Sequence, residues 1–371
     1  MKGYKLILCL MAGLLVAGCG SGAVKEGKMK VMKQPFGKTV QGDGVDLYTL
    51  DNGSGMVVKI TTFGGIVTSL QVPGRQGKPV DVVLGFDTLG DYLKGHPYFG
   101  ALIGRYGNRI ANGRFQLAGQ DYQLATNNGA NHLHGGDAGF DKKVWKGEAI
   151  ESPDEVGVRL TYLSKDMEEG YPGNLSVTVA YTINRRQELK IVYHATTDKA
   201  TPVNLTHHSY FNLNGHGTIL DHELMIAAGH FLPVDPGLIP TGERRAVKQT
   251  AMDFTSFQPI GSRIEQVEGG YDHNYILNGY DGTLREAARV KGNQSGIVMI
   301  LLTTEPGLQF YSGNFLDGSL RGKGGQWYQK YSGFCLEAQH FPDSPNRPGF
   351  PNTILKPGEV YSQTTVYRFS R

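Results

Sequence analysis

The chain has 371 residues, enough for one large all-β domain or for two domains of average size. Glycine is plentiful, at 52 residues, and charged residues make up only 19%, which favours short strands and turns over long solvated helices. The formal net charge of +3 includes two lysines among the first five residues, so the remainder is close to neutral, which argues against nucleic-acid or phosphate-rich partners.

The N-terminus has the pattern of an export signal. Lys2 and Lys5 precede an apolar run over residues 6–16, which is too short to span a bilayer. The run ends in Ala17-Gly18-Cys19, which resembles the lipobox of bacterial lipoproteins, where the cysteine is acylated and becomes the new N-terminus. Ordinary secretion with an incidental cysteine is the alternative interpretation.

The lipobox interpretation divides the chain into three parts. We predict a lipoprotein signal peptide over residues 1–18, a flexible tether over residues 19–34, and one catalytic domain over residues 35–371. The protein would then be exported and anchored to a membrane through a lipid on Cys19, facing either the periplasm or the cell exterior. Cys9 would leave with the signal and Cys335 stands alone, so we expect no disulfide within the chain.

Residues 35–371 have the pattern of a large, mostly antiparallel β-sandwich. Short segments with alternating or β-branched residues recur between Gly, Asn and Asp turns, and sustained helical periodicity is absent. No linker, fixed-period repeat or second long apolar stretch interrupts them. The predicted strands cover residues 44–50, 56–63, 114–117, 120–124, 175–183, 189–196, 297–303 and 360–369.

Several common chemistries lack their sequence signatures. Gly37-Lys38-Thr39 has no upstream glycine to complete a phosphate-binding loop, and His222-Glu223 lacks the second histidine of a zinc-protease helix. No G-x-S-x-G, C-x-x-C or G-x-G-x-x-G sequence is present. These absences disfavour serine-hydrolase, zinc, redox and dinucleotide-dependent functions.

A polar cluster occupies the strand-like segment 204–213. Alternate side chains of an extended strand share a face, which places His208 with Tyr210 on a polar face and His207 on the opposite, apolar side. An ordinary solvated sheet surface would show the same alternation. This segment alone therefore leaves a catalytic and a structural role for His208 equally open.

Glu337 lies in the strand-like segment 331–340, directly before a polar loop that begins at His340. An isolated strand glutamate is usually a surface residue, but Asp272 and Gln309 lie in other aromatic, strand-like segments. Carboxylates, amides and aromatic rings together suit a sugar cleft, because hydroxyl groups need polar partners and the ring faces need flat apolar ones.

Five motifs, in this order along the chain, resemble the aldose 1-epimerase (galactose mutarotase) family. The resemblance extends over about residues 35–370 and implies that family's β-sandwich, with a sugar in an open cleft, no metal and no organic cofactor. His207 and His132 depart from the residues that other members have there, Asn in many and Ser in some, but both positions are secondary. The motifs cover residues 104–110, 131–136, 204–213, 272–274 and 335–339.

The resemblance implies that His208 is the proton donor and Glu337 the proton acceptor in the interconversion of the α and β anomers of a free aldose. A histidine with an ordinary pKa near 6.5 would be only partly protonated at neutral pH, and we expect Asp272 to raise the pKa of His208. The residues implied to hold or line the sugar site are Asn108, Arg109, His134, Ser209, Tyr210, Asp272 and Gln309.

Two other functions remain open at this level. Glu337 and Asp272 could be the carboxylate pair of a glycoside hydrolase, or the chain could be a carbohydrate-binding lipoprotein without turnover. Release of reducing sugar from a glycoside would identify the hydrolase. The sequence leaves the preferred aldose and the oligomeric state open.

Overall fold

The computed structural model describes Met1 and residues 27–371 of the chain. Residues 2–18 of the predicted signal peptide and Cys19 lie outside the described residues. The domain begins before the predicted boundary at residue 35, because β1 (Lys30–Lys38) pairs along its length with β2 (Gly44–Asp51). Residues 30–34 are therefore part of a sheet and not of a tether. Met29, just before this strand, is buried in the core.

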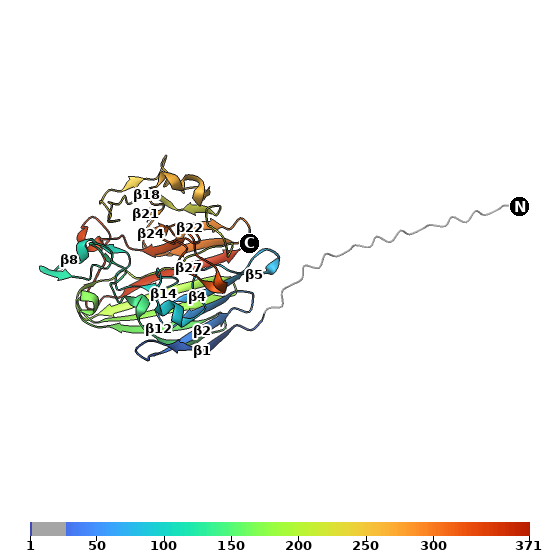
Figure 1. Cartoon of the computed structure of the whole chain (residues 1–371), viewed down its shortest axis with the longest axis horizontal. Helices are drawn as coiled ribbons and strands as arrows, with labels where there is room; N and C mark the ends of the chain where they lie inside the picture. Colours follow the sequence, from blue (N-terminus) through green and yellow to red (C-terminus); the bar gives the residue numbers. More distant parts are fainter. Residues whose placement is uncertain (2–26) are drawn as a thin grey trace.

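Three antiparallel sheets make up the body of the molecule (Figure 1). The first sheet contains β1, β2, β3 (Val57–Thr61), β4 (Val67–Pro73) and β5 (Pro79–Asp81). The second contains, in spatial order, β11 (Lys146–Glu151), β12 (Glu155–Ser164), β13 (Leu175–Asn184), β14 (Glu188–Thr197), β27 (Tyr361–Ser370), β23 (Val298–Thr303), β22 (Arg285–Lys291), β17 (Glu223–Ile226) and β20 (Gln258–Pro259). The third contains β19 (Arg245–Ala246), β18 (Ala228–Phe231), β21 (Asp272–Leu277), β24 (Gly307–Tyr311) and β25 (Cys335–Gln339).

Short paired strands and single helical turns connect the sheets. The strand pairs are β6 (Leu102–Ile103) with β16 (Thr206–His207), β7 (Arg109–Ile110) with β10 (His132–Leu133), β8 (Arg114–Leu117) with β9 (Gln120–Gln123), and β15 (Thr201–Pro202) with β26 (Ile354–Leu355). The helical elements are α1 (Leu89–Leu93) and the 3₁₀ turns η1 (Arg75–Gly77), η2 (Ala111–Gly113), η3 (Phe140–Lys142), η4 (Glu168–Gly170), η5 (Ile260–Gln266), η6 (Lys323–Gly325) and η7 (Ser344–Asn346). No helix among the described residues is long and apolar enough to cross a membrane.

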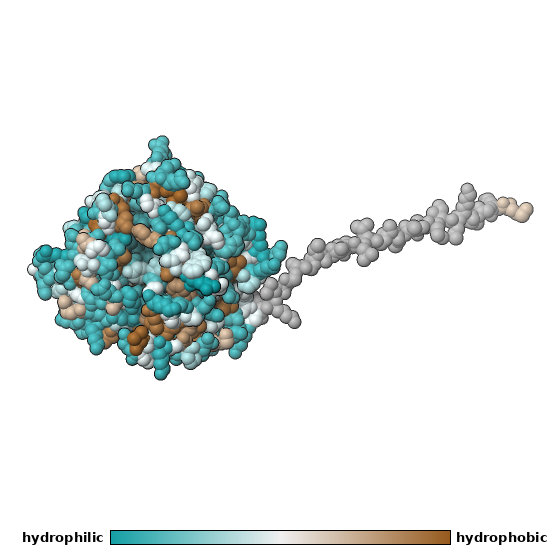
Figure 2. Space-filling view, viewed as in Figure 1, coloured by the Kyte–Doolittle hydropathy of each residue, from teal (hydrophilic) through white to brown (hydrophobic). Residues whose placement is uncertain are grey.

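The predicted all-β sandwich is confirmed, and the longer predicted strands lie within one or two residues of β2, β13, β14, β23 and β27. The C-terminal strand β27 lies between β14 and β23, so it joins the two halves of the second sheet. One core cluster connects all three sheets, with Val58 from the first, Val179 from the second and Leu308 from the third. On the face shown in Figure 2, apolar residues form separate patches among hydrophilic ones, as is usual for a protein surface.

The loop after β25 is held by an ion pair beside the third sheet. His340 Nδ1 lies 2.6 Å from Glu305 Oε2, and both side chains are largely buried. Burial lowers the pKa of His340, but the charge and the hydrogen bond of Glu305 outweigh it, so the pKa lies above its ordinary value of 6.5. Protonated His340 is therefore more stable in the folded chain than in the unfolded one.

This pair should make part of the stability dependent on pH. Its contribution is complete below about pH 6.5, the unfolded value, and is lost as the pH rises through the higher folded pKa of His340. We expect the difference in urea midpoint between the wild type and His340→Gln to shrink as the pH increases from about 6 to about 9. His230→Gln, which changes an exposed histidine, is the matched control, and a constant difference would contradict the prediction.

Candidate active site

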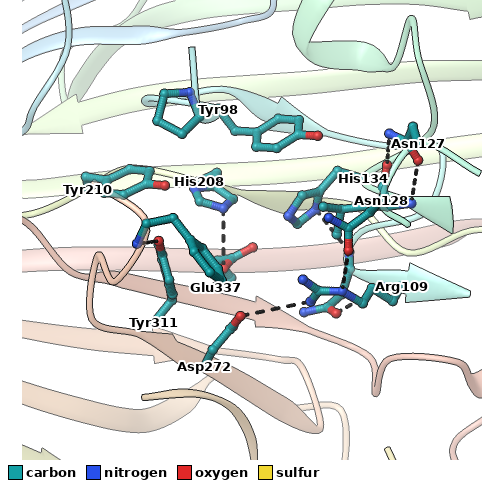
Figure 3. Close-up of a pocket in the computed structure, with 14 residues that line it drawn as sticks. Tyr98, Arg109, Asn127, Asn128, His134, His208, Tyr210, Asp272, Tyr311 and Glu337 are labelled. Carbon is teal, nitrogen blue, oxygen red and sulfur yellow. Dashed lines mark hydrogen bonds and ion pairs between the residues drawn. The ribbon is translucent and has the colours of Figure 1, made fainter. Parts of the chain in front are cut away.

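A cleft of about 250 Å³ lies where β7, β21 and β25 approach the segment 204–213 (Figure 3). Its size is just below the range typical of pockets for drug-sized ligands, so it suits a small ligand. Polar and aromatic side chains from distant parts of the sequence converge on it. The lining residues are Pro97, Tyr98, Asn108, Arg109, Asn127, Asn128, Leu133, His134, His208, Tyr210, Asp272, Tyr311, Phe315 and Glu337.

The segment 204–213 is not the continuous strand that we predicted, because only β16 has regular strand geometry. Its backbone nevertheless stays extended: His208 N–H donates to the carbonyl of Ala101, and Tyr210 O accepts from Leu84 N–H. The predicted alternation therefore holds, and both His208 and Tyr210 line the cleft.

Ser209 lies outside the cleft, although the family resemblance implies that it lines the site. It is on the opposite face of the extended segment from His208, and its hydroxyl is 2.7 Å from His207 Nε2. Both side chains are buried in the protein interior. Ser209 is thus placed to orient His207 and not to touch a ligand.

Glu337 and His208 face each other across the cleft. Glu337 Oε1 lies 3.7 Å from His208 Nε2, and the two side chains are only 3% and 5% exposed. Glu337 comes from the central position of β25, while His208 comes from the segment 204–213. The second carboxylate oxygen, Oε2, is buried and has no hydrogen-bond partner within the described residues.

Burial favours the uncharged form of both groups. It raises the pKa of Glu337 well above its ordinary value, an effect that the Asp272 carboxylate increases and Arg109 opposes. It lowers the pKa of His208 to about 4. The expectation that Asp272 raises the pKa of His208 is therefore wrong, because the charge of Asp272 acts on Glu337 instead. Burial therefore opposes the ionised form of each member of the pair.

His134 presents a hydrogen-bond donor to the cleft. The backbone N–H of Asn108 donates to His134 Nδ1 at 3.1 Å, and burial keeps the pKa of His134 well below its ordinary value. A neutral imidazole whose Nδ1 accepts carries its proton on Nε2. Gly135 makes this geometry possible, since a Cβ at that position would lie 1.9 Å from the carbonyl oxygen of Gly104.

The same tautomer argues against a metal ion. Ligand atoms of His134, His208 and Glu337 all lie within 4.8 Å of one another, as a three-ligand metal site requires. A metal ligand must offer a lone pair, whereas the Nδ1 lone pair of His134 is engaged and its Nε2 is protonated. The donor set is better suited to the oxygen atoms of a sugar.

Arg109, Asp272 and Gln309 form a polar network along one wall. Arg109 Nη1 lies 4.0 Å from Asp272 Oδ2, and Gln309 Nε2 donates to Asp272 Oδ1 at 2.7 Å. The strand register explains this arrangement, since Gln309 on β24 pairs with Glu337 on β25 and with Asn274 on β21. Asp272 lines the cleft but Gln309 does not, so Gln309 is placed to hold Asp272 from behind.

Sequence reasoning missed several lining residues. Asn128 accepts a hydrogen bond from Arg109 Nε at 3.0 Å, and Asn127 binds both the N–H and the carbonyl of Leu133, next to His134. The Asn-Asn-Gly sequence at 127–129 was the available signal. Tyr98 had none: it comes from the loop after α1, and its ring lies 4.6 Å from that of His134 and 5.6 Å from that of His208. The other lining residues outside the predicted set are Pro97, Leu133, Tyr311 and Phe315.

Comparisons with known proteins identify the family that this chain resembles. The model of the family described as Aldose 1-epimerase matches residues 46–368. The chain is 48% identical to galactose mutarotase of Bos taurus over 346 residues, which are 92% of this chain and 99% of that protein. It is 39% identical to aldose 1-epimerase of Escherichia coli (strain K12) over 331 residues, 87% of this chain and 94% of that one. A solved structure of galactose 1-epimerase from Lactobacillus acidophilus has a TM-score of 0.82 at 28% identity and covers 92% of this chain and 99% of that chain.

Proposed function

This chain belongs to the aldose 1-epimerase family, and on that basis we propose that Glu337 and His208 catalyse the interconversion of the α and β anomers of a free aldose in the cleft described above. The observation that carries the residue assignment is the 3.7 Å separation of Glu337 Oε1 and His208 Nε2 in a buried site. An acid and a base with opposite pKa shifts, held side by side, are suited to exchanging protons with one substrate.

The reaction needs two proton transfers in each direction. Glu337 takes the proton of the C1 hydroxyl, whose O–H electrons form the C1=O double bond as the bond from C1 to the ring oxygen breaks. The ring oxygen takes a proton from His208. After rotation about C1–C2 the same two groups reverse these transfers on the other face of the aldehyde, so the enzyme returns to its starting state.

Substrate binding sets the protonation state that this sequence requires. Burial favours the uncharged forms of Glu337 and His208, whereas ring opening requires a carboxylate and an imidazolium. Sugar hydroxyl groups that donate to Glu337 stabilise the carboxylate, and the nearby Arg109 does the same. Binding therefore favours the charged forms of the pair, in which Glu337 is a carboxylate and His208 an imidazolium.

The direct test is polarimetry on freshly dissolved α-D-glucose and α-D-galactose with the protein lacking residues 1–19. Acceleration above the spontaneous rate is the expected result. Repetition with pentoses extends the test to other aldoses. If none of these sugars responds while a sugar still binds, the chain is a binding module, and release of reducing sugar from a glycoside would mean a hydrolase.

We expect kcat/KM to depend on pH as a broad bell. Its acid limb should lie below pH 6.5, because the group that gains a proton there is His208, and burial lowers the pKa of His208 to about 4. Its alkaline limb should lie well above the ordinary glutamate range, because burial raises the pKa of Glu337, the group that loses its proton on that limb. The limbs belong to the pair as a whole. A fall in kcat/KM between about pH 7 and about pH 6 would contradict this assignment.

Arg109→Ala should weaken substrate binding as well as lower the rate. Arg109 borders the cleft, where its guanidinium is placed to hold sugar oxygens together with Asp272, and its charge also favours the Glu337 carboxylate. We expect KM to rise by about tenfold or more, as loss of a charged hydrogen bond predicts. Arg114→Ala, which removes an exposed arginine paired with Asp121, is the matched control. An unchanged KM in Arg109→Ala would contradict the role.

We also propose that the mature protein is exported and anchored to a membrane through Cys19. The proposal rests on the charged start, the short apolar run and the Ala-Gly-Cys ending of residues 1–19. Expression in a bacterial host with labelled palmitate should label the wild type but not Cys19→Ala. Equal labelling of the two, or none in either, would contradict the anchor.

A further inference from the structure

Cys335 contacts the ring nitrogen of His208 that faces away from Glu337. Its Sγ lies 3.5 Å from His208 Nδ1, and the thiol is completely buried. Cys335 and Glu337 are two residues apart on β25, so their side chains project from the same face of one strand. Side chains of one strand therefore face both nitrogens of His208. The thiol of Cys335 is next to Nδ1, and the carboxyl group of Glu337 is next to Nε2.

The other neighbours of the imidazole are rings that lie against it and do not occupy Nδ1. The ring centroids lie 5.6 Å away for Tyr98, 5.1 Å for His134, 5.2 Å for Tyr210 and 6.5 Å for Tyr311. Within the described residues, Cys335 is the one side chain with a polar contact to Nδ1. Whether that nitrogen carries a proton thus depends on its contact with the thiol.

A thiol can serve His208 in both of its protonation states. The sulfur accepts from Nδ1–H when the ring is protonated and also after Nε2 has given up its proton. This arrangement keeps the proton of the neutral ring on Nδ1 and leaves the lone pair of Nε2 facing Glu337. Burial raises the pKa of Cys335 well above its ordinary value, so the S–H group is present throughout the neutral range.

We infer that Cys335 is a positioning residue for the epimerase reaction: by accepting from Nδ1–H, it holds neutral His208 in the Nδ1–H tautomer and keeps Nε2 as the nitrogen that exchanges the proton with the substrate. This inference rests on the proposed function, in which Nε2 of His208 exchanges the proton with the ring oxygen. It explains why a buried cysteine lies on the sheet face that carries the proposed base.

The test compares Cys335→Ala, which has no group for Nδ1, with Cys335→Ser, whose hydroxyl can both donate and accept. We expect Cys335→Ala to lower kcat by about three- to tenfold with little change in KM, and Cys335→Ser to recover most of the loss. Leu336→Val is the control for packing, because Leu336 is buried on the opposite face of β25 and does not contact the imidazole.

Nitrogen-15 NMR of histidine-labelled protein provides a readout that does not depend on activity. The His208 signal, identified by its loss in His208→Asn, should report the Nδ1–H tautomer in the wild type and in Cys335→Ser. Cys335→Ala should give a mixture of the two neutral tautomers. An unchanged tautomer and kcat in Cys335→Ala, or equal losses in the Ala and Ser variants, would overturn the inference. An inactive wild type with the expected tautomer pattern would instead disprove the proposed function.

Discussion

Glu337→Gln is expected to lower kcat by about 10²- to 10⁴-fold, the usual contribution of a general base. The amide has nearly the same shape as the carboxyl group but cannot take the C1 hydroxyl proton. Glu337 is buried in the cleft and faces His208 Nε2, so its replacement removes the carboxylate that is placed to act as the base. Polarimetry at saturating sugar, corrected for the spontaneous rate, measures the effect.

Glu305→Gln is the matched control for this substitution. Glu305 is also buried, but its partner is His340 and it does not line the cleft. Its replacement should leave kcat within about twofold of the wild type, because it removes no group that touches the substrate. If Glu337→Gln kept most of the wild-type kcat, Glu337 would not be the base.

His208→Asn should cause a loss of similar size, about 10²- to 10⁴-fold in kcat, because the ring oxygen then lacks its proton donor. The two groups act on one substrate in one proton-transfer sequence, so their effects should not add. We therefore expect the double variant Glu337→Gln/His208→Asn to be about as slow as the slower single variant. The same polarimetric assay gives all three rates.

Independent losses that multiply in the double variant would contradict the coupled pair. His207→Asn separates the effect of the acid from a general effect on packing. His207 is buried next to His208 in the chain, but it lies outside the cleft and contacts Ser209. This variant should be less stable than the wild type while keeping its kcat within about threefold.

The sequence by itself predicted the β-sandwich, and the family resemblance of its motifs implied His208 and Glu337 as the acid–base pair that we propose. Strand patterns of period two are local, because each depends on alternating contact with core and solvent. The alternating residues therefore predicted β13, β14 and β27 close to their observed positions. The same alternation separated His208 from His207 although the segment is mostly irregular, since hydrogen bonds on both sides keep it extended.

Only the tertiary structure decided how these residues meet. Tyr98 and Asn128 enter the cleft because loops distant in sequence fold over it, while Ser209 is excluded and Gln309 lies behind Asp272. The direction of the pKa shifts depends on burial and on charges from other strands, so no sequence pattern could show that burial lowers the pKa of His208. The start of the domain likewise depends on the pairing of β1 with β2, a contact that residues 30–34 alone do not reveal. Local periodicity determines which side a residue faces, but long-range packing determines what it faces.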